Sequence, residues 1–117
     1  MKALIIDDEI DICLLLSDIL RNKNLQPDYV NSIGEAKQAL EKNSPGIIFL
    51  DNHLPDGMGV DFIRYIKNTQ PAAKLVMISA YDAPAHRSIA ITEGVDLFIS
   101  KPFSRDTIYQ IVDQLAQ

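Results

Sequence analysis

The sequence lacks several features that mark secreted, membrane-spanning or nucleic-acid-binding proteins. It has one cysteine among 117 residues, so no disulfide can form within the chain, which fits a reducing cytoplasm. No apolar run approaches the roughly 20 residues that cross a bilayer, and residues 1–6 lead too soon into aspartates for a signal peptide. With 11 Lys and Arg against 16 Asp and Glu, the net charge of -5 argues against a nucleic-acid surface. We expect a soluble, cytoplasmic protein.

The length and composition predict one domain over residues 1–117. Hydrophobic residues make up 47% of the chain and charged residues 23%, which is ordinary for a soluble globular protein with a single core. The sequence contains no linker, internal repeat or low-complexity segment. Because it stops where the last predicted helix stops, we expect either a single-domain protein or a domain cut from a longer one.

Short apolar runs alternate with longer segments of helical periodicity. The apolar runs predict strands at residues 2–6, 25–30, 46–50, 74–79 and 97–100. The periodic segments predict helices at residues 9–22, 32–42, 60–68, 84–92 and from 104 onward. Pro27 favours an edge position for the second strand. This alternation predicts an α/β fold, a doubly wound sheet of five parallel strands with five helices.

Local signals accompany several of these helices. Ser32 and Glu35 have the spacing of a capping box, Ser104 is expected to cap the last helix, and Gly94 is a stop signal. The first helix is expected to bury a broad apolar face made of Ile12, Leu15, Leu16, Ile19 and Leu20. Cys13 in the same stretch is expected to be buried and inert, because no His or Lys lies nearby in sequence to lower its pKa.

Polar residues follow four of the five predicted strands. Asp7 and Asp8 follow the first strand, Asp51 follows the third, and Ser79 and Lys101 mark the ends of the fourth and fifth. The carboxyl ends of parallel strands lie at one edge of a sheet, so these side chains are expected to converge. Carboxylates, a hydroxyl and a lysine gathered there suit a hard cation and a phosphoryl group.

The three aspartates are the candidate acidic cluster. Carboxylates held close together repel one another unless a cation lies among them, and oxygen ligands favour Mg²⁺. Asp51 is also a candidate nucleophile, since a carboxylate can form an acyl phosphate. Plainer interpretations stay open for each residue alone: residues 7–9 can cap the first helix, Asp51 and Ser79 can be loop residues, and Lys101 can be a solvated surface residue.

Four motifs together carry a resemblance to a known family. They are residues 5–9 (IIDDE), 51–59 (DNHLPDGMG), 77–80 (MISA) and 100–103 (SKPF). The chain resembles the receiver domain of bacterial two-component response regulators from residue 2 to the last helix. In that family an Asp is followed by an apolar residue and Pro, then by Gly at a fixed distance, as here in Asp51, Leu54, Pro55 and Gly59. The resemblance implies the flavodoxin-like receiver fold, with strand order 2-1-3-4-5.

The resemblance implies how the acidic residues would act. Asp51 would accept a phosphoryl group from a sensor histidine kinase or a histidine phosphotransfer protein. Asp8 and Asp51 would ligate Mg²⁺, for which Mn²⁺ could substitute, together with the main-chain carbonyl of His53. Asp7 would help through a bound water. These roles agree with phosphoryl transfer, which depends on positioning and charge neutralisation.

The resemblance also implies a switch. Lys101 would pair with a phosphoryl oxygen, aimed by a cis bond before Pro102, and Ser79 would move to bind the phosphoryl group. Phe98 would then rotate and repack the surface of the fourth helix, fifth strand and fifth helix, through which family members often dimerise. The phosphate would bias an existing equilibrium. The output would belong to an effector domain or a downstream protein. The protein would not be a conventional enzyme, although it would promote its own phosphorylation and slow dephosphorylation.

Three less typical positions surround the expected site. His53 and Tyr81 stand two residues after Asp51 and Ser79, where a side chain can affect hydrolysis of the acyl phosphate. For His53 a passive, exposed imidazole is the favoured interpretation, although it can titrate near neutral pH. His86 on the fourth helix is expected to be a solvated surface residue.

Three other functions compete with the switch. A Mg²⁺-dependent phosphatase or phosphotransferase with an aspartyl nucleophile generally needs a second Asp at position 53, which is His here. A flavodoxin-like cofactor binder needs a Gly- and Ser/Thr-rich phosphate loop after the first strand, where Asp7 and Asp8 would repel phosphate. A receiver fold that serves only for docking would not need the intact polar set. Acetyl phosphate with Mg²⁺ should add one phosphate, and Asp51→Asn should lose it.

Overall fold

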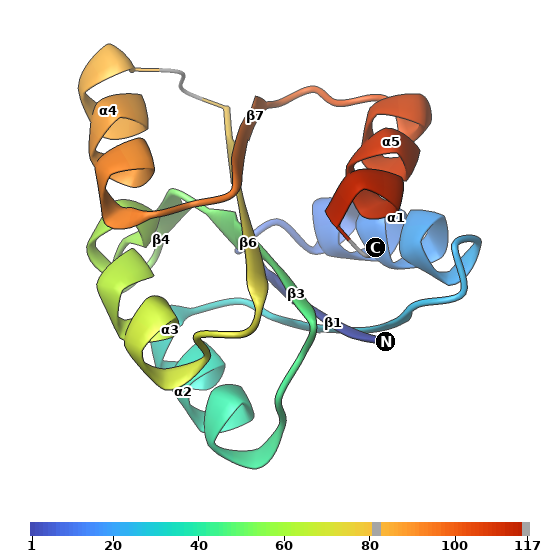
Figure 1. The fold of residues 1–117 in the computed structure, drawn as a ribbon, viewed down its shortest axis with the longest axis horizontal. Helices are drawn as coiled ribbons and strands as arrows, with labels where there is room; N and C mark the ends of the chain where they lie inside the picture. The colour runs from blue at the N-terminus through green and yellow to red at the C-terminus, as the bar shows by residue number, and fades with distance from the viewer. Residues whose placement is uncertain (81–82, 116–117) are drawn as a thin grey trace.

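The computed structural model describes residues 1–80 and 83–115, and a five-stranded parallel sheet runs through its centre (Figure 1). The strands are β1 (Lys2–Ile6), β2 (Gln26–Val30), β3 (Ile47–Asp51), β6 (Lys74–Ser79) and β7 (Leu97–Ser100). Their spatial order is β2-β1-β3-β6-β7, and all neighbouring pairs are parallel. The predicted sheet and its strand order are confirmed, because β6 and β7 are the fourth and fifth strands of this sheet.

Within the described residues, five α-helices cover the two faces of the sheet. They are α1 (Ile10–Arg21), α2 (Ile33–Lys42), α3 (Ile63–Thr69), α4 (Pro84–Glu93) and α5 (Arg105–Leu115). Figure 1 shows α1 and α5 on one face, and α2, α3 and α4 on the other. None of the helices that the structure describes is long and apolar enough to cross a membrane.

The core consists of two apolar clusters, one under each helical layer. All of β3 is buried, as its continuous apolar run predicts for a central parallel strand. Side chains alternate between the faces of a strand, so Phe49 joins the cluster under α1 and α5, and Leu50 joins the one under α2, α3 and α4. This burial fixes β3 firmly and leaves Asp51 at its end.

The segment after β3 differs from the prediction. The residues between the predicted strand 46–50 and the predicted helix 60–68 form a small antiparallel hairpin of β4 (His53–Leu54) and β5 (Gly57–Met58). The predicted helix 60–68 is divided into a 3-10 turn, η1 (Gly59–Asp61), and α3, which begins at Ile63. The Val60 amide donates to the side chain of residue 52, the Phe62 amide donates to Gly59 O in the 3-10 turn, and the first i to i-4 bond here is from Ile66 to Phe62 O.

The buried face of α1 is narrower than predicted. Cys13, Leu16, Ile19 and Leu20 are buried, as expected for a helix that packs on a sheet. Leu15 was included in the predicted apolar face, but 44% of it is exposed. The sheet and α5 contact one side of α1, so apolar residues that lie round from that side stay in solvent.

The helix signals at Ser32, Gly94 and Ser104 and the edge position of Pro27 are confirmed. The Ser32 hydroxyl oxygen accepts a hydrogen bond from the Glu35 amide at 3.1 Å, and Ser104 caps α5 through the Thr107 amide at 3.1 Å. Gly94 ends α4 with a φ of 100°, a conformation that favours glycine. Pro27 lies in β2, an edge strand of the sheet.

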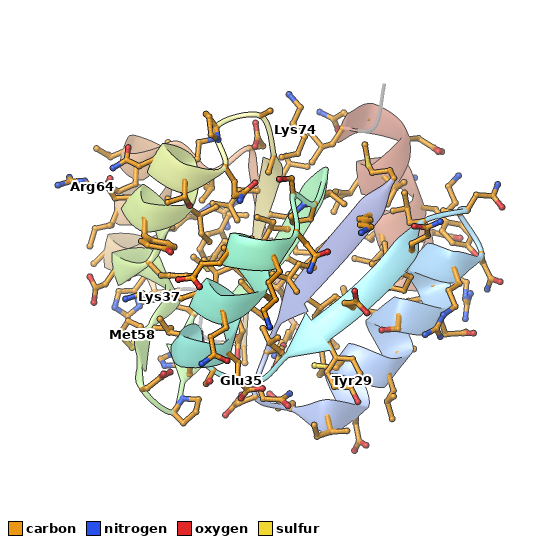
Figure 2. All side chains as sticks on the ribbon, turned by 90° about the horizontal axis from the view of Figure 1, so that it is seen from below. Tyr29, Glu35, Lys37, Met58, Arg64 and Lys74 are labelled. Carbon is orange, nitrogen blue, oxygen red and sulfur yellow. The ribbon has the colours of Figure 1, made fainter. Side chains whose placement is uncertain are left out.

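A carboxylate from the β4–β5 hairpin caps α2 from outside the helix. The two Asp56 oxygens accept hydrogen bonds from the amides of Ile33 at 2.9 Å and Gly34 at 3.0 Å. These bonds satisfy two donors at the helix start and lower the pKa of the Asp56 carboxyl. Figure 2 shows the hairpin near α2, with Met58 on the side of Lys37. The loop that follows β3 is thereby tied to α2.

Asp56→Asn is expected to lower the melting temperature at pH 7 by a few degrees, because an amide can accept from only one of the two N–H groups. The pKa of Asp56 is lower in the folded protein than in the unfolded chain. The ionised carboxylate therefore stabilises the wild type above the ordinary pKa of an aspartate, and this stabilisation is lost as the pH falls through the pKa of Asp56 in the folded protein. The difference between the proteins should therefore shrink in acid. Thermal unfolding from pH 2 to 7 tests this, with Asp28→Asn as an exposed control. A difference that does not change with pH would contradict the capping role.

Candidate functional site

The structure brings the predicted site residues together at the carboxyl edge of the sheet. Asp7 and Asp8 follow β1, Asp51 ends β3, Ser79 ends β6 and Lys101 follows β7. Asp7, Asp51 and Ser79 are buried, whereas Asp8 is exposed. The site is therefore anchored in the core and open to solvent on the Asp8 side.

Asp7, Asp8 and Asp51 form a compact acidic cluster. One carboxylate oxygen from each residue lies within 4.8 Å of the others. Three like charges at that separation are unfavourable without a cation. The donor set, all carboxylate oxygens with one exposed member, is compatible with a divalent metal ion.

Lys101 supplies positive charge to this cluster. Its Nζ lies 2.8 Å from Asp7 Oδ2, 3.2 Å from Glu9 Oε1 and 3.6 Å from Asp51 Oδ1. The peptide bond between Lys101 and Pro102 is cis, as the family resemblance implies. Burial opposes the ammonium charge, but the hydrogen bond to Asp7 and the charges of Asp51 and Asp7 outweigh it and raise the pKa of Lys101. The lysine is thus held charged at the edge of the acidic cluster.

Glu9 is a site residue that the sequence argument did not identify. It occupies the cap position of α1, but its side chain makes no capping hydrogen bond and pairs with Lys101 instead. Asp7 likewise does not cap the helix: its Oδ1 accepts from the Glu9 amide at 2.9 Å, which shapes the turn before α1. The signal for Glu9 is its place directly after two aspartates of the candidate acidic cluster.

The environment of Asp51 disfavours its ionised form. Burial is the largest cause, followed by the charge of Asp7, and together they raise its pKa from 3.8 to about 7 despite the opposing effect of Lys101. A carboxyl with such a pKa is partly protonated at neutral pH, so a bound cation would restore its charge. A perturbed carboxyl beside an open acidic cluster is typical of a functional residue.

Polar contacts from β2 and α1 hold the backbone of Asp7. The Asp7 amide donates to Val30 O at 3.1 Å, and the Asn31 side chain donates to Asp7 O at 2.9 Å. The Cys13 thiol also points at Asp7 O, with a separation of 3.3 Å. Cys13 is buried, as predicted, and burial, followed by the charge of Asp7, raises the pKa of its thiol to about 12.

Gly59 allows the loop after β3 to pass closely over the acceptor strand. A Cβ atom at this position would lie 2.3 Å from the main-chain oxygen of Asp51, and the Gly59 amide donates to Asn52 O at 2.7 Å. Because the opposing atoms belong to the backbone, they cannot rotate away. The glycine expected from the motif is therefore required by the close backbone approach.

Gly59→Ala is expected to lower the free energy of unfolding by about 2–3 kcal/mol, since the new methyl group forces the backbone at Asp51 to move. Gly34→Ala is a matched control: its Cβ would meet Asp56 Oδ2 at 3.5 Å, an ordinary contact, within a helix that prefers alanine. That variant should be neutral or more stable. Urea unfolding of both proteins measures the difference, and equal stabilities would contradict the steric argument.

The two histidines are more buried than predicted. His53 was expected to be exposed, but it is half-buried and its Nε2 is shielded from solvent. His86 was expected to be a surface residue, but its Nδ1 lies 3.0 Å from the Asn52 side-chain nitrogen. The rings meet edge-on, with centroids 6.3 Å apart. Both histidines are partly buried because α4 packs over the loop that follows Asp51. Tyr81 lies outside the described residues.

Ser79 and Phe98 occupy neighbouring strands at this edge. Ser79 is fully buried, and its carbonyl oxygen accepts from the Lys101 amide at 2.8 Å. Phe98 is 9% exposed and belongs to the cluster under α2, α3 and α4. The Arg87 guanidinium of α4 lies 5.0 Å from the ring centroid. Phe98 is thus a packed aromatic that contacts α4 in this conformation.

Comparison with known proteins identifies the family and the fold. Residues 3–113 match the sequence profile of the family described as response regulator receiver domain. The chain belongs to this family. It is a receiver domain of the kind found in two-component response regulators, and such domains work with kinases and effector domains.

Two curated relatives at 30% identity or more are longer than this receiver domain. The domain is 32% identical to the response regulator protein PilR of Pseudomonas aeruginosa, over 95% of this chain and 25% of that protein. It is 30% identical to the phosphate regulon transcriptional regulatory protein PhoB of Escherichia coli, over 88% of this chain and 46% of that protein. This receiver domain therefore spans less than half the length of each of these two relatives.

Solved structures agree with this receiver fold. A two-component response regulator from Clostridium difficile superposes with a TM-score of 0.95 at 27% identity, over 99% of this chain and 95% of the other. The beryllofluoride-activated NtrC4 receiver domain dimer has a TM-score of 0.92 at 31% identity, over 97% and 94%. A response regulator from Burkholderia pseudomallei shares the fold at 23% identity, with a TM-score of 0.87 over 92% and 64%; that protein carries a phosphorylated aspartic acid and a calcium ion.

Proposed function

We propose that Asp51 is the phosphoryl acceptor of this receiver domain. The observation that supports this best is its placement: Asp51 ends the central buried strand, belongs to the acidic cluster and lies 3.6 Å from the Lys101 ammonium. A carboxylate oxygen would attack the phosphorus of a phosphohistidine. A P–O bond forms, the P–N bond breaks, and its electron pair returns to the imidazole. The donor would be a sensor histidine kinase or a histidine phosphotransfer protein.

The neighbouring residues would stabilise the negative charge of the transferred group. Lys101 is already charged and buried, so a short movement from Asp7 toward Asp51 would bring it to a phosphoryl oxygen. The Ser79 hydroxyl, at the end of the adjacent strand, would donate a hydrogen bond to another oxygen. No general base is needed, because the nucleophile is a carboxylate.

The acidic cluster fits Mg²⁺, with Mn²⁺ as a substitute. Asp8 and Asp51 would hold the ion with the main-chain carbonyl of His53, and Asp7 would act through a bound water. When bound, the ion would neutralise charge on the carboxylates and the phosphoryl oxygens. The raised pKa of Asp51 agrees with this assignment, because burial and the neighbouring charge of Asp7 disfavour the carboxylate and a bound cation would favour it.

Phosphorylation would act as a signal. A serine that moves toward the phosphoryl group would free space beside β7, and Phe98 would repack against α4 and α5. Because Phe98 has no hydroxyl, the signal would depend on packing alone. The protein would be a switch in the cytoplasm that promotes its own phosphorylation and slow dephosphorylation, with His53 and Tyr81 affecting the rate of hydrolysis. The α4, β7 and α5 surface would control an effector domain or a partner, or form a homodimer.

Phosphorylation by a small donor tests this proposal. Acetyl phosphate with Mg²⁺ is expected to add one phosphate to the protein, seen by intact mass, and Asp51→Asn should remain unlabelled. Removal of divalent cations with EDTA should reduce labelling by at least about tenfold, because charge neutralisation supplies much of the catalysis of phosphoryl transfer.

Asp28→Asn, which removes an exposed carboxylate of β2, is the matched control and should label as the wild type does. Far-UV circular dichroism would verify that each variant is folded. Equal labelling of Asp51→Asn would show that another residue is the acceptor.

A further inference from the structure

Asn52, directly after the proposed acceptor, is a fully buried polar side chain with hydrogen bonds at both ends. Its Oδ1 accepts from the Val60 amide at 3.0 Å, and its Nδ2 lies 3.0 Å from His86 Nδ1. A peptide N–H can only donate, so Val60 fixes which end of the amide is oxygen. Asn52 therefore donates to His86.

The direction of this bond fixes the state of the His86 ring. Because the amide nitrogen of Asn52 has no lone pair to offer, His86 Nδ1 must be the acceptor. The ring is then neutral with its proton on Nε2. The bond joins α4 to the first residue after β3, and through Val60 the same side chain reaches η1.

Few apolar contacts attach α4 to the rest of the domain. Ala90 is its only buried residue, while 44% of Ile89 and 62% of Ile91 are exposed. Polar contacts therefore contribute to the attachment of the helix: the hydrogen bond from Asn52 to His86, the guanidinium of Arg87 over Phe98, and the ion pair of Glu93 with Arg64 of α3 at 2.8 Å. A helix attached in this way can change position at low cost, and a single hydrogen bond affects where it lies.

We propose that Asn52 and His86 are positioning residues that couple α4 to the loop carrying the acceptor, separately from Ser79 and Phe98. If α4 moves away, the buried Nδ2 of Asn52 loses its acceptor, which disfavours that state. If the loop after Asp51 rearranges around a phosphoryl group, the bond breaks and α4 is released. This inference rests on the proposed function of Asp51 and adds a second connection from it to the α4 surface.

Replacement of His86 separates this coupling from a purely structural contact. His86→Leu removes the acceptor, whereas His86→Asn restores one, because its Oδ1 occupies the place of Nδ1. Leucine is the better helix former, so helix propensity works against the expected effect. Ser88→Ala, at an exposed position of the same helix, is the control.

Two measurements are needed. In His86→Leu, the amides of α4 should exchange hydrogen about tenfold faster than in the wild type, with those of β3 little changed. With Mg²⁺, beryllofluoride should half-saturate His86→Leu at a concentration about three- to tenfold lower than it does the wild type. The reason is that the variant's ligand-free conformation has lost a stabilising contact, so the ligand shifts the equilibrium more easily. His86→Asn and Ser88→Ala should resemble the wild type in both measurements.

The outcomes distinguish the coupling from the proposed function. Unchanged hydrogen exchange in α4 of His86→Leu would show that the hydrogen bond between Asn52 and His86 does not hold the helix. Faster exchange with an unchanged beryllofluoride midpoint would show a structural contact only, and either result overturns the coupling. If the wild type itself did not respond to beryllofluoride, the proposed function of Asp51 would be contradicted instead.

Discussion

Asp51→Asn is expected to stabilise the metal-free protein by about 2–4 kcal/mol at pH 8, although it removes the acceptor. The Asp51 carboxylate is 4% exposed and lies beside Asp7, which raises its pKa from 3.8 to about 7. A shift of this size converts to about 4 kcal/mol against the ionised form, and solvent that reaches the cluster lowers this figure. Asparagine keeps the shape without the charge. Urea unfolding in EDTA measures the gain.

The stability gained by Asp51→Asn is expected to depend on pH because the pKa of Asp51 is raised in the folded protein. Between about pH 4 and pH 7 the folded protein keeps a proton on Asp51 that the unfolded chain has already lost. The wild type therefore loses stability as the pH rises through this window and reaches a plateau above it. The advantage of Asp51→Asn should grow from pH 4 to pH 7 and then level.

A control and a metal titration complete this test. Asp28→Asn, at an exposed position, should change stability by less than about 0.5 kcal/mol. Mg²⁺ should raise the free energy of unfolding of the wild type, because the ion neutralises the acidic cluster. The difference in the free energy of unfolding between the wild type and Asp51→Asn should therefore become smaller. A wild type more stable than Asp51→Asn at pH 8 without metal would show that the three carboxylates do not repel one another as inferred.

Lys101→Met is expected to destabilise the metal-free protein by about 3 kcal/mol at pH 8. The lysine side chain is 8% exposed and is the cation closest to Asp7 and Asp51. Its removal leaves buried carboxylates without their partner, which is the costly way to break a buried ion pair. Mg²⁺ should restore part of the loss, since it supplies positive charge to the same oxygens.

Lys67→Met is the matched control for this replacement. Lys67 lies 3.9 Å from Asp96 in a partly exposed pair, so its loss should cost less than about 1 kcal/mol. Urea unfolding with and without Mg²⁺ compares the two variants. Equal losses, or a loss in Lys101→Met that Mg²⁺ does not reduce, would contradict the electrostatic account.

The position of the site was predictable because it depends on the sheet alone. Once residues 2–6 and 46–50 are identified as buried parallel strands, the polar residues after them must share one edge. Asp7, Asp51 and Lys101 meet there for that reason. The cis bond before Pro102 came from the family resemblance, since the base rate for X-Pro bonds favours trans.

Contacts between elements distant in sequence were not predictable in the same way. The bond between Asn52 and His86 depends on the angle at which α4 crosses the loop after β3, which no local pattern sets. The spacing of apolar residues in α1 indicates a helix but not how wide its buried face is. The prediction that Leu15 is buried was therefore wrong. The 3-10 turn before α3 likewise contains a tertiary contact, the hydrogen bond from the Val60 amide to the Asn52 side chain, which no local pattern indicates.

Pro27 in β2 has a consequence for how this domain avoids aggregation. The Gln26 amide donates inward to Met1 O at 3.0 Å, so the next residue's nitrogen faces away from β1. Pro27 has no backbone N–H to donate to an incoming chain. A strand that docked against β2 would therefore have one main-chain carbonyl without a hydrogen bond. Strand addition at the β2 border of the sheet is thereby disfavoured by a single residue.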